Sequence, residues 1–531
     1  MFQTVPKTKQ VAIAACMALV VFVASLLAGY YPIYKKGYTS GGDTLNLIKA
    51  RNYAAVGTYQ YESSNGVLLS TDHVLAQSKK TGLINPLTPI IYGQIFKYWG
   101  INRVSGLPEY VSLISAAIFN VLAFFIIRRL FGGKVGFFST MAMAFMPFRI
   151  IGSLSFGFYD FAMIFFAIAI WLVLGSKNGI FRGGNIRMGL ASIFFALAAL
   201  ARNAFLISFI PFVLYDFYKE RSIKRSFVFI LPFIIIFGST LTPYSWLGVS
   251  NGYISDINNQ PFDQLGEVFP DPYTAYYDRD NFIQKLQNEG LERNASHFLG
   301  QWGYSVTVGE KISAYEESLK AYVAYASDLI IFGGPLILFF MIFGAYWLYR
   351  NGREMFHFFG LWLGVWLTGL IYFQTGNWDH LLEIILVPAI LTGLGIWQIT
   401  EFIKPININK NIISGVILLF VLGHLTYANK WSLYDSYRSS RWVDAVNAAD
   451  KVKLAPRGVI AAGIHPTFAN GLNYLTNRDI IYFNPGAIEK LIANGKLKEA
   501  FEIYNVKTAV GFSDSASNSI KKMTNATIIP F

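Results

Sequence analysis

The sequence predicts a polytopic α-helical membrane protein of about eleven transmembrane helices, with a small extracytoplasmic α/β domain at its C-terminus. Three observations predict this fold class. Hydrophobic residues make up 54% of the 531 residues and charged residues only 14%, a balance typical of polytopic membrane proteins. Long apolar segments recur along the chain as far as residue 428. From residue 429 onward the composition changes to short alternating strand and helix patterns.

Apolar segments of roughly 17 to 25 residues, the length that crosses a bilayer, define the predicted spans. They lie near 11–31, 107–130, 135–151, 158–175, 188–203, 204–218, 227–247, 326–349, 356–374, 382–401 and 411–428. The first follows Lys7 and Lys9 and has the composition of a signal peptide, but its length and the ten later spans favour an uncleaved helix.

Basic residues in the short loops orient these spans by the positive-inside rule. The predicted inner loops carry Arg128, Arg129, Lys134, Lys177, Arg182, Arg187, Lys219, Arg221, Lys224, Arg225, Arg350, Arg353, Lys404 and Lys410. We predict that the protein lies in the plasma (inner) membrane with its N-terminus in the cytoplasm. This orientation places loops 32–106 and 248–325 outside. We predict a transmembrane module over residues 1–428, which includes both loops, and an extracytoplasmic α/β domain over residues 429–531.

The charge and the cysteine content exclude other classes of protein. The net charge of +13 arises mostly from loop residues between apolar spans, so no nucleic-acid partner is expected. The single Cys16 allows neither an intramolecular disulfide nor a cysteine metal site. The sequence contains no P-loop, H-E-x-x-H or G-x-S-x-G motif.

The C-terminal segment alternates helices and strands at the spacing of a small parallel sheet. Helices are predicted over 441–452, 468–478 and 486–505, and strands over 458–463, 479–483 and 506–512.

Ionisable residues gather in the predicted outer turns, where they lie close to membrane depth. Such groups are costly there and are usually retained for function. The residues are Asp43 after Gly41 and Gly42, Arg149, Asp160, Arg202, Asp379, His380 and Glu383. Arginine and histidine suit a lipid-linked phosphate, and a nearby carboxylate can take a proton from an attacking hydroxyl.

Each of these residues also has a structural interpretation. Asp43 is a good N-cap for a helix over 44–56, a role compatible with catalysis because a helix N-terminus favours the ionised carboxylate. Arg149 and Arg202 could reach lipid headgroups, and Asp160 could bridge to either of them. His380 could be an interfacial histidine whose hydrogen bonds are all made, and Glu383 could be a buried partner of another polar group. In the first outer loop, Asp72, His73, Lys79 and Lys80 could be ordinary solvated charges.

Several segments resemble, in order, those of the GT-C class of polyprenyl-phosphate-dependent membrane glycosyltransferases, which includes lipid A aminoarabinose transferases and protein O-mannosyltransferases. "GGDTLNLIKARNYAAVGTYQY" resembles the family's first juxtamembrane helix with its acid, and "INPLTPIIYGQIFKYWG" resembles its second. The later outer turns and the tail resemble the family in "MPFRIIGSLSFGFYDFAMIFFAIAIWLVLG", "LAALARNAFLISFIPFVLY", "DHLLEIILVPAILTGLGI" and "LNYLTNRDIIYF".

The resemblance implies an EC 2.4 hexosyl- or pentosyl-type transferase. It would move a sugar, with inversion, from a polyprenyl-phosphate donor to a hydroxyl of a lipid, glycan or protein acceptor on the extracytoplasmic face. Asp43 would be the general base, and Asp160 would assist acceptor or metal binding. The other predicted substrate-binding residues are Arg149, Arg202, His380, Asp379, Lys79 and Lys80.

This scheme requires no cofactor, although two acids could hold Mg²⁺ or Mn²⁺. A transporter or flippase of lipid-linked sugars is the alternative, but transporters need a polar path at mid-membrane, whereas these ionisable residues stop at the outer face. An inactive scaffold of the cell envelope is the third interpretation.

Overall fold

The structure is a computed structural model of the chain. It describes residues 7–36, 44–57, 60–62, 68–70, 87–99, 107–153, 159–174, 184–202, 204–239, 316, 319–320, 323–325, 327–329, 331–373, 378–402, 410–430, 440–464, 466–478, 480–483, 485–503 and 505–530. The chain divides into two compact units. The first comprises Met1–Gly37, Glu109–Ser239 and Tyr315–Arg438, and the second comprises Tyr38–Pro108, Thr240–Ala314 and Ser439–Phe531.

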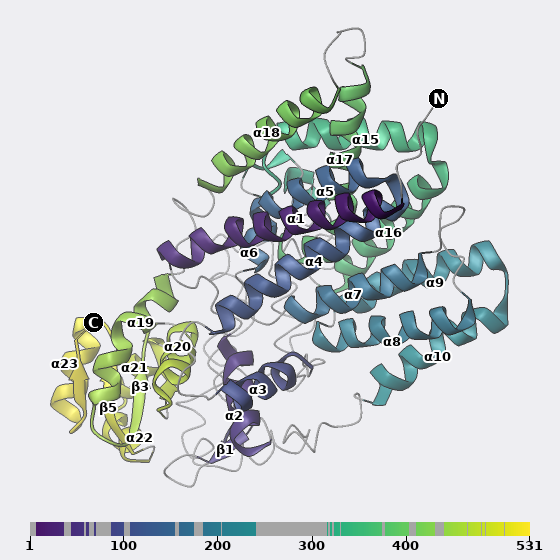
Figure 1. The fold of residues 1–531 in the computed structure, drawn as a ribbon. Helices are drawn as coiled ribbons and strands as arrows, with labels where there is room; N and C mark the ends of the chain where they lie inside the picture. The colour runs from purple at the N-terminus through teal and green to yellow at the C-terminus, as the bar shows by residue number, and fades with distance from the viewer. Residues whose placement is uncertain are drawn as a thin grey trace, which may run out of the picture. The chain divides into compact units, whose positions relative to one another are not determined.

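The first unit consists of helices (Figure 1). They are α1 (Lys7–Lys36), α4 (Leu107–Phe131), α5 (Gly133–Phe145), α6 (Pro147–Ser153), α7 (Asp160–Val173), α8 (Asn185–Ala201), α9 (Phe205–Glu220), α10 (Ile223–Ser239), α15 (Pro335–Asn351), α16 (Arg353–Phe373), the 3₁₀ helix η4 (Trp378–Ile384), α17 (Leu386–Phe402) and α18 (Lys410–Asn429). Within the described ranges, three helices are long and apolar enough to cross a membrane: Thr8–Tyr30, Tyr110–Phe131 and Lys410–Asn429. Several shorter apolar helices accompany them, as expected for a multi-pass membrane protein.

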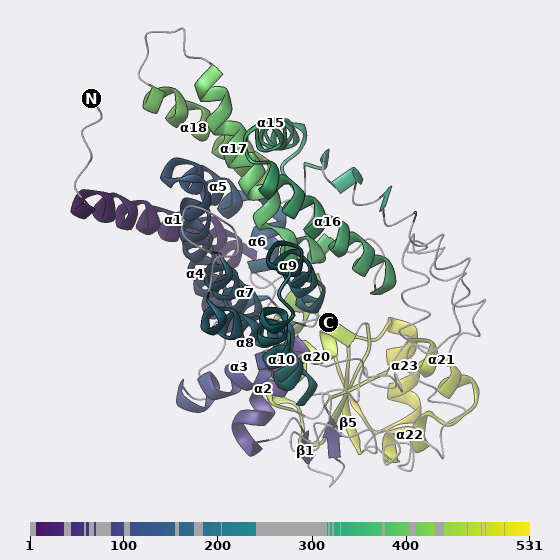
Figure 2. The ribbon, with the colours of Figure 1, turned by 90° about the vertical axis from the view of Figure 1, so that its right-hand side faces the viewer.

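Glycines bring the helices around α17 into close contact. α17 packs against α15, α5 and α18 (Figures 1 and 2). A Cβ atom on Gly395 would lie 2.0 Å from the Phe340 carbonyl oxygen, and one on Gly344 would lie 1.9 Å from the Leu391 carbonyl oxygen. Small residues that let backbones approach are the usual means of helix association where lipid removes the hydrophobic driving force.

Aromatic rings fill the space between α7, α8, α9, α10 and α16, which also pack together. The Phe166 ring lies 5.7 Å from Phe195 and 5.7 Å from Trp362, centroid to centroid, and Phe195 lies 5.0 Å from Phe212. These separations suit edge-to-face packing, which adds stabilisation beyond the area that the rings bury.

All eleven predicted apolar segments overlap a described helix, but three of them differ in detail. The segment 135–151 is broken at Met146, whose backbone is extended (φ −63, ψ 128), and Pro147 begins α6. The segment 326–349 forms α15 only from Pro335, because Gly333 and Gly334 have φ values of +97 and +81. The segment 382–401 begins inside η4, and α17 starts at Leu386.

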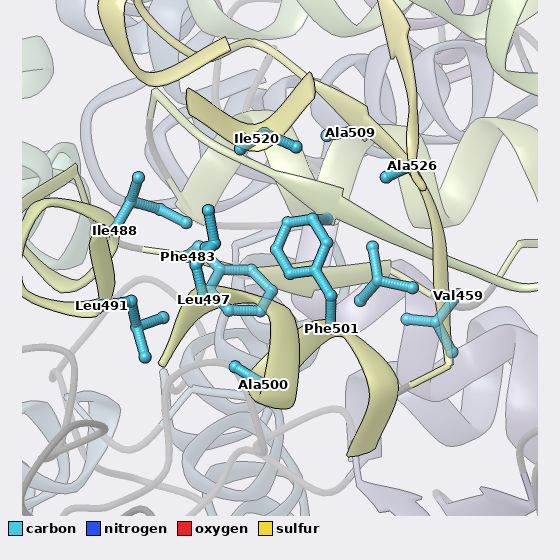
Figure 3. Packing of buried hydrophobic residues seen from close by; sticks show 12 residues of the cluster. Val459, Phe483, Ile488, Leu491, Leu497, Ala500, Phe501, Ala509, Ile520 and Ala526 are labelled. Atoms are coloured by element: carbon cyan, nitrogen blue, oxygen red, sulfur yellow. The ribbon is translucent and has the colours of Figure 1, made fainter. Parts of the chain in front are cut away.

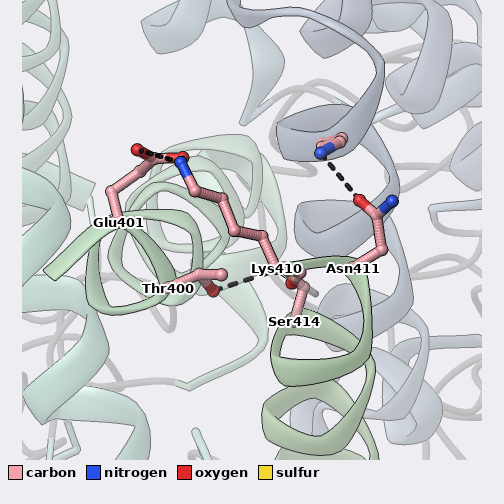
Figure 4. A network of polar contacts seen from close by, with 6 residues as sticks. Thr400, Glu401, Lys410, Asn411 and Ser414 are labelled. Carbon is pink, nitrogen blue, oxygen red and sulfur yellow. Dashed lines mark hydrogen bonds and ion pairs between the residues drawn. The ribbon is translucent and has the colours of Figure 1, made fainter. Parts of the chain in front are cut away.

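Polar side chains join the ends of α5, α17 and α18 (Figure 4). The Lys134 ammonium donates to Asn411 Oδ1 at 2.9 Å, and its nitrogen lies 4.8 Å from the centre of the Trp397 ring. Lys410 pairs with Glu401 at 3.2 Å. These contacts bring the predicted inner loops around Lys134 and Lys410 to the same end of the helices.

The second unit combines two helices from the first predicted outer loop, a short hairpin and an α/β domain. Its elements are α2 (Thr44–Val56), β1 (Gln60–Glu62), β2 (Leu68–Ser70), α3 (Leu87–Trp99), α19 (Ser440–Leu454), β3 (Val459–Ala462), α20 (Pro466–Thr476), β4 (Ile480–Tyr482), α21 (Pro485–Ala493), α22 (Leu497–Ile503), β5 (Val506–Val510), α23 (Asp514–Met523) and β6 (Thr527–Ile529). The four-stranded sheet is parallel, with the strand order β4-β3-β5-β6.

The two faces of this sheet carry different cores, because neighbouring strand residues point to opposite sides. Val459 and Ala461 of β3 pack with α21, α22 and α23 (Figure 3), whereas Ile460 and Ala462 pack with α19 and α20. The predicted C-terminal α/β fold is therefore confirmed. The sequence interpretation missed α23 and β6, and its single helix over 486–505 is two helices separated at Gly495, which has φ +67.

Candidate functional site

The predicted base, Asp43, lies outside the described residues, as do Lys79, Lys80, Asp72 and His73. Helix α2 begins at the next residue, Thr44, and extends to Val56, the bounds predicted from the sequence, whereas the capping role of Asp43 stays a prediction.

Arg149 lies on α6, just after the break at Met146. Its side chain is buried, with 3% of its surface exposed, and its Nη2 donates to the Ala116 carbonyl of α4 at 3.2 Å. Its guanidinium carbon also lies 5.2 Å from the centre of the Phe119 ring. The cation is therefore buried and contacts α4 through a carbonyl and an aromatic ring.

Arg202 ends α8 in an extended conformation and is half-buried. Its Nη2 donates to the Tyr159 hydroxyl at 2.7 Å, and its guanidinium carbon lies 4.4 Å from the Tyr159 ring centre. Tyr159 directly precedes Asp160, the first residue of α7, and its ring packs on Phe205 at the start of α9. The Asp160 side chain lies outside the described residues, but its backbone and Arg202 are both adjacent to Tyr159.

Helix η4 carries Asp379, His380 and Glu383. It packs against α6, α9 and α16, so it lies beside the short helix that carries Arg149. Glu383 is buried with 1% exposure, as predicted, whereas the side chains of Asp379 and His380 lie outside the described residues.

The first unit therefore packs α6, which carries Arg149, against η4, and separately joins Arg202 to Tyr159 at the start of α7. Each of these two guanidinium groups lies against an aromatic ring and is shielded from water fully (Arg149) or in part (Arg202), and electrostatic interactions are stronger where water is excluded. Among the described side chains, no group of three or more His, Cys, Asp or Glu residues could hold a metal ion.

The sequence interpretation missed one buried cation, Arg51 on α2. With 5% of its surface exposed, it donates to the Asn473 carbonyl (2.7 Å), to Asn473 Oδ1 (2.7 Å) and to the Tyr474 carbonyl (3.4 Å), all on α20. The signal was present in the sequence, since Arg51 follows Leu47 by four residues and so lies on the same, buried face of the helix.

Helix α2 is also held from the side of α3. A Cβ atom on Gly93 of α3 would lie 2.7 Å from the Tyr53 ring and 2.9 Å from the Ala50 carbonyl oxygen. The helix that follows Asp43 is thus packed against α3 and hydrogen-bonded to the C-terminal α/β domain.

No protein family and no curated protein sequence matches the chain. Its fold is similar over nearly the whole length to multi-pass membrane glycosyltransferases of the GT-C class, which confirms the resemblance at the level of the fold. ArnT from Cupriavidus metallidurans, bound to undecaprenyl phosphate, shares 11% identity at a TM-score of 0.50, over 98% of this chain and 90% of that one.

Two solved structures from Archaeoglobus fulgidus share the fold, with similar sequence identity and TM-score. The oligosaccharyltransferase AglB, in complex with an inhibitory peptide and a dolichol-phosphate, has 12% identity and a TM-score of 0.50, over 93% of this chain and 69% of that one. The A. fulgidus oligosaccharyltransferase in complex with Zn and sulfate has 12% identity and a TM-score of 0.50, with 93% and 67% coverage.

Proposed function

We propose that the protein is a glycosyltransferase that moves a sugar from a polyprenyl-phosphate donor to a hydroxyl of a lipid, glycan or protein acceptor. The observation that carries this proposal is the fold similarity to ArnT, which covers both chains almost completely and whose solved structure holds undecaprenyl phosphate. The AglB structure, which holds a dolichol-phosphate and a peptide, supports the same donor class.

In the proposed reaction, Asp43 removes the proton of the acceptor hydroxyl. The hydroxyl oxygen forms a bond to the anomeric carbon of the sugar while the bond from that carbon to the phosphate oxygen breaks, so the configuration inverts. The proton ends on the Asp43 carboxylate, and the electron pair of the broken bond ends on the polyprenyl phosphate. Asp160 would help to hold the acceptor.

The departing phosphate gains negative charge, which nearby cations stabilise in the transition state. Arg149 and Arg202 are the proposed phosphate ligands in the first unit, supported by their burial against Phe119 and Tyr159. His380 and Asp379 on η4 are proposed as further substrate contacts, with Lys79 and Lys80 from the first outer loop. The scheme needs no metal, although Asp43 and Asp160 offer oxygen ligands for Mg²⁺ or Mn²⁺.

Sugar transfer by the purified full-length protein in lipid nanodiscs tests the proposal. The assay supplies radiolabelled polyprenyl-phosphate sugars with a crude envelope extract as acceptor, and compares wild type with Asp43→Asn. We expect transfer by the wild type and a loss of about 10² to 10⁴-fold in the variant, the usual contribution of a general base. Asp450→Asn is the matched control, because the Asp450 side chain is 92% exposed.

Two outcomes would count against the proposal, one against the role of Asp43 and the other against the enzyme class. Undiminished transfer by Asp43→Asn would remove Asp43 as the base but leave the enzyme class. Donor binding without transfer by the wild type would instead favour the transporter or scaffold interpretation.

A further inference from the structure

The C-terminal α/β domain contains a pocket at the carboxyl edge of its sheet, between β3 and β5. The strand order explains why a pocket forms there. The chain runs from β3 through α20 on one face to β4, and then through α21 and α22 on the other face to β5. Because β5 pairs with β3 on the side opposite β4, the segments that leave β3 and β5 turn to opposite faces of the sheet. In open α/β sheets, ligands bind in the crevice that forms at such a switch point.

A pocket of about 280 Å³ lies at this switch point. Ile464 follows β3, and Gly511, Phe512 and Ser513 follow β5. The helices α21 and α23 complete the lining with Ile488, Glu489 and Ala516. Ile488 also belongs to the domain core shown in Figure 3, so one wall of the pocket is anchored in packed structure.

The backbone at the edge of the pocket is unusual. Ile464 has φ +60 and Gly511 has φ +73. A β-branched residue in the left-handed region is strained, and such strain tends to persist at ligand-binding sites. A Cβ atom on Gly463 would lie 2.4 Å from the Gly511 carbonyl oxygen, so the two segments that leave β3 and β5 approach closely at this point.

The lining selects the class of ligand. Ile464, Ile488 and Phe512 offer apolar surface, Glu489 offers a carboxylate acceptor, and the Ser513 hydroxyl accepts from the Ala516 amide at 3.3 Å, which leaves its hydrogen to donate. The described residues that line the pocket include no lysine or arginine, so against the Glu489 charge a phosphate would find only the N-terminus of α23, whose first turn already carries the Asp514 carboxylate. Drug-sized ligands occupy pockets of about 300–1,000 Å³, so this one suits a smaller molecule.

From this geometry we infer that the pocket binds a single neutral sugar ring, with one ring face on Phe512 and hydroxyl groups on Glu489 and Ser513. An aromatic face for the apolar C–H surface and a carboxylate for the hydroxyl edge are complementary to a pyranose or furanose and to neither a phosphate nor a purely apolar ligand. This site goes beyond the proposed transfer reaction, and its occupancy is measurable without a donor.

Saturation-transfer NMR on the full-length protein in nanodiscs tests the inference. The probes are free glucose, galactose, mannose, N-acetylglucosamine, xylose and arabinose, with inorganic phosphate as a comparison. We expect at least one sugar to bind the wild type and inorganic phosphate not to compete with it. Ala516→Leu, which fills the pocket, and Glu489→Gln, which removes the charge at an exposed position, should each weaken binding at least tenfold.

Glu499→Gln, at an exposed position of α22 that does not line the pocket, is the matched control and should bind as the wild type does. Asp43→Asn should also retain this binding, which separates the pocket from the proposed transfer site. The inference is overturned when no sugar of the panel binds, when binding survives both pocket variants, or when inorganic phosphate displaces the sugar.

Discussion

At the scale of single residues, Arg51 shows how a buried cation can join distant parts of a chain. Its partner Asn473 is 422 positions away in sequence. The periodicity of α2 reveals that Arg51 lies on the same face as Leu47, but no local pattern identifies the acceptors on α20. The partners of Arg51 therefore could not be predicted from the sequence, although its burial could.

Arg51→Ala should lower the stability of the second unit. The two shorter hydrogen bonds involve a charged donor, and bonds of this kind contribute about 1.5–3 kcal/mol each, so we expect a loss of roughly 3 kcal/mol. The measurement is the apparent unfolding midpoint in detergent, combined with Asn473→Ala in a double-mutant cycle. Asn473→Ala removes the side-chain acceptor of Arg51, and also the Nδ2 bond to the Arg478 carbonyl (3.1 Å), which cancels in the cycle, so the coupling between the two changes should be about 1 kcal/mol or more.

The exposed Arg457→Ala is the control for loss of a surface arginine and should leave the midpoint unchanged. Strictly additive effects of Arg51→Ala and Asn473→Ala would mean that the hydrogen bond between these side chains contributes nothing measurable.

At the scale of elements, hydropathy located the helices well and their breaks poorly. The apolar segment 135–151 continues through Met146, yet the backbone there is extended and a new helix, α6, begins at Pro147. Proline at a first helical position is a recognisable signal for the start of a helix. The signal at Pro147 was missed because the apolar segment continues through it. The 3₁₀ helix over 378–384 has no comparable local signal in the sequence, and its contacts are with α6, α9 and α16, which are far from it in sequence.

The contact between α15 and α17 depends on two glycines, and Gly395→Ala should disrupt it. The new methyl group would lie 2.0 Å from the Phe340 carbonyl oxygen and 2.7 Å from its carbon, which are backbone atoms that a rotamer change does not move. Inserting a methyl group into a packed core costs about 1–3 kcal/mol, so the apparent unfolding midpoint should fall by several degrees. Gly344→Ala, across the same contact, should behave in the same way.

Gly364→Ala on α16 is the matched control, because a Cβ atom there meets nothing within 4 Å. It should leave the midpoint unchanged or raise it slightly, since alanine favours a helix over glycine by about 1 kcal/mol. Equal midpoints for Gly395→Ala and Gly364→Ala would show that α15 and α17 do not pack as described.

At the scale of the whole molecule, contacts between helix ends agree with the predicted grouping of the inner loops. Lys219 at the end of α9 pairs with Glu354 at the start of α16 at 2.8 Å, which joins two predicted inner loops, whereas the pair of Arg225 with Asp216 at 2.9 Å closes one of those loops. The basic residues of the short loops predict from the sequence that these loops lie on one side, because each basic loop carries its own orientation signal. Which helices pack together depends on long-range contacts between glycines and aromatic rings, and periodicity does not encode that choice.

The predicted orientation has a direct test, because the chain contains a single cysteine, Cys16. In a Cys16→Ser background, Lys224→Cys and Lys521→Cys each place one thiol at an exposed position. Lys224 lies in a predicted inner loop, whereas Lys521 belongs to the C-terminal α/β domain, which an odd number of spans places outside. A membrane-impermeant maleimide applied to intact cells should label the second thiol, and it should label the first only after permeabilisation.

Labelling of both thiols in intact cells would mean that the span count has the wrong parity, with the short helices α5 and α9 as the first candidates for re-examination. Labelling of Lys224→Cys alone would reverse the orientation and place the C-terminal α/β domain in the cytoplasm. In that case Arg51 would join α2 to a cytoplasmic domain, and the proposed transfer of sugar on the extracytoplasmic face would have to be abandoned.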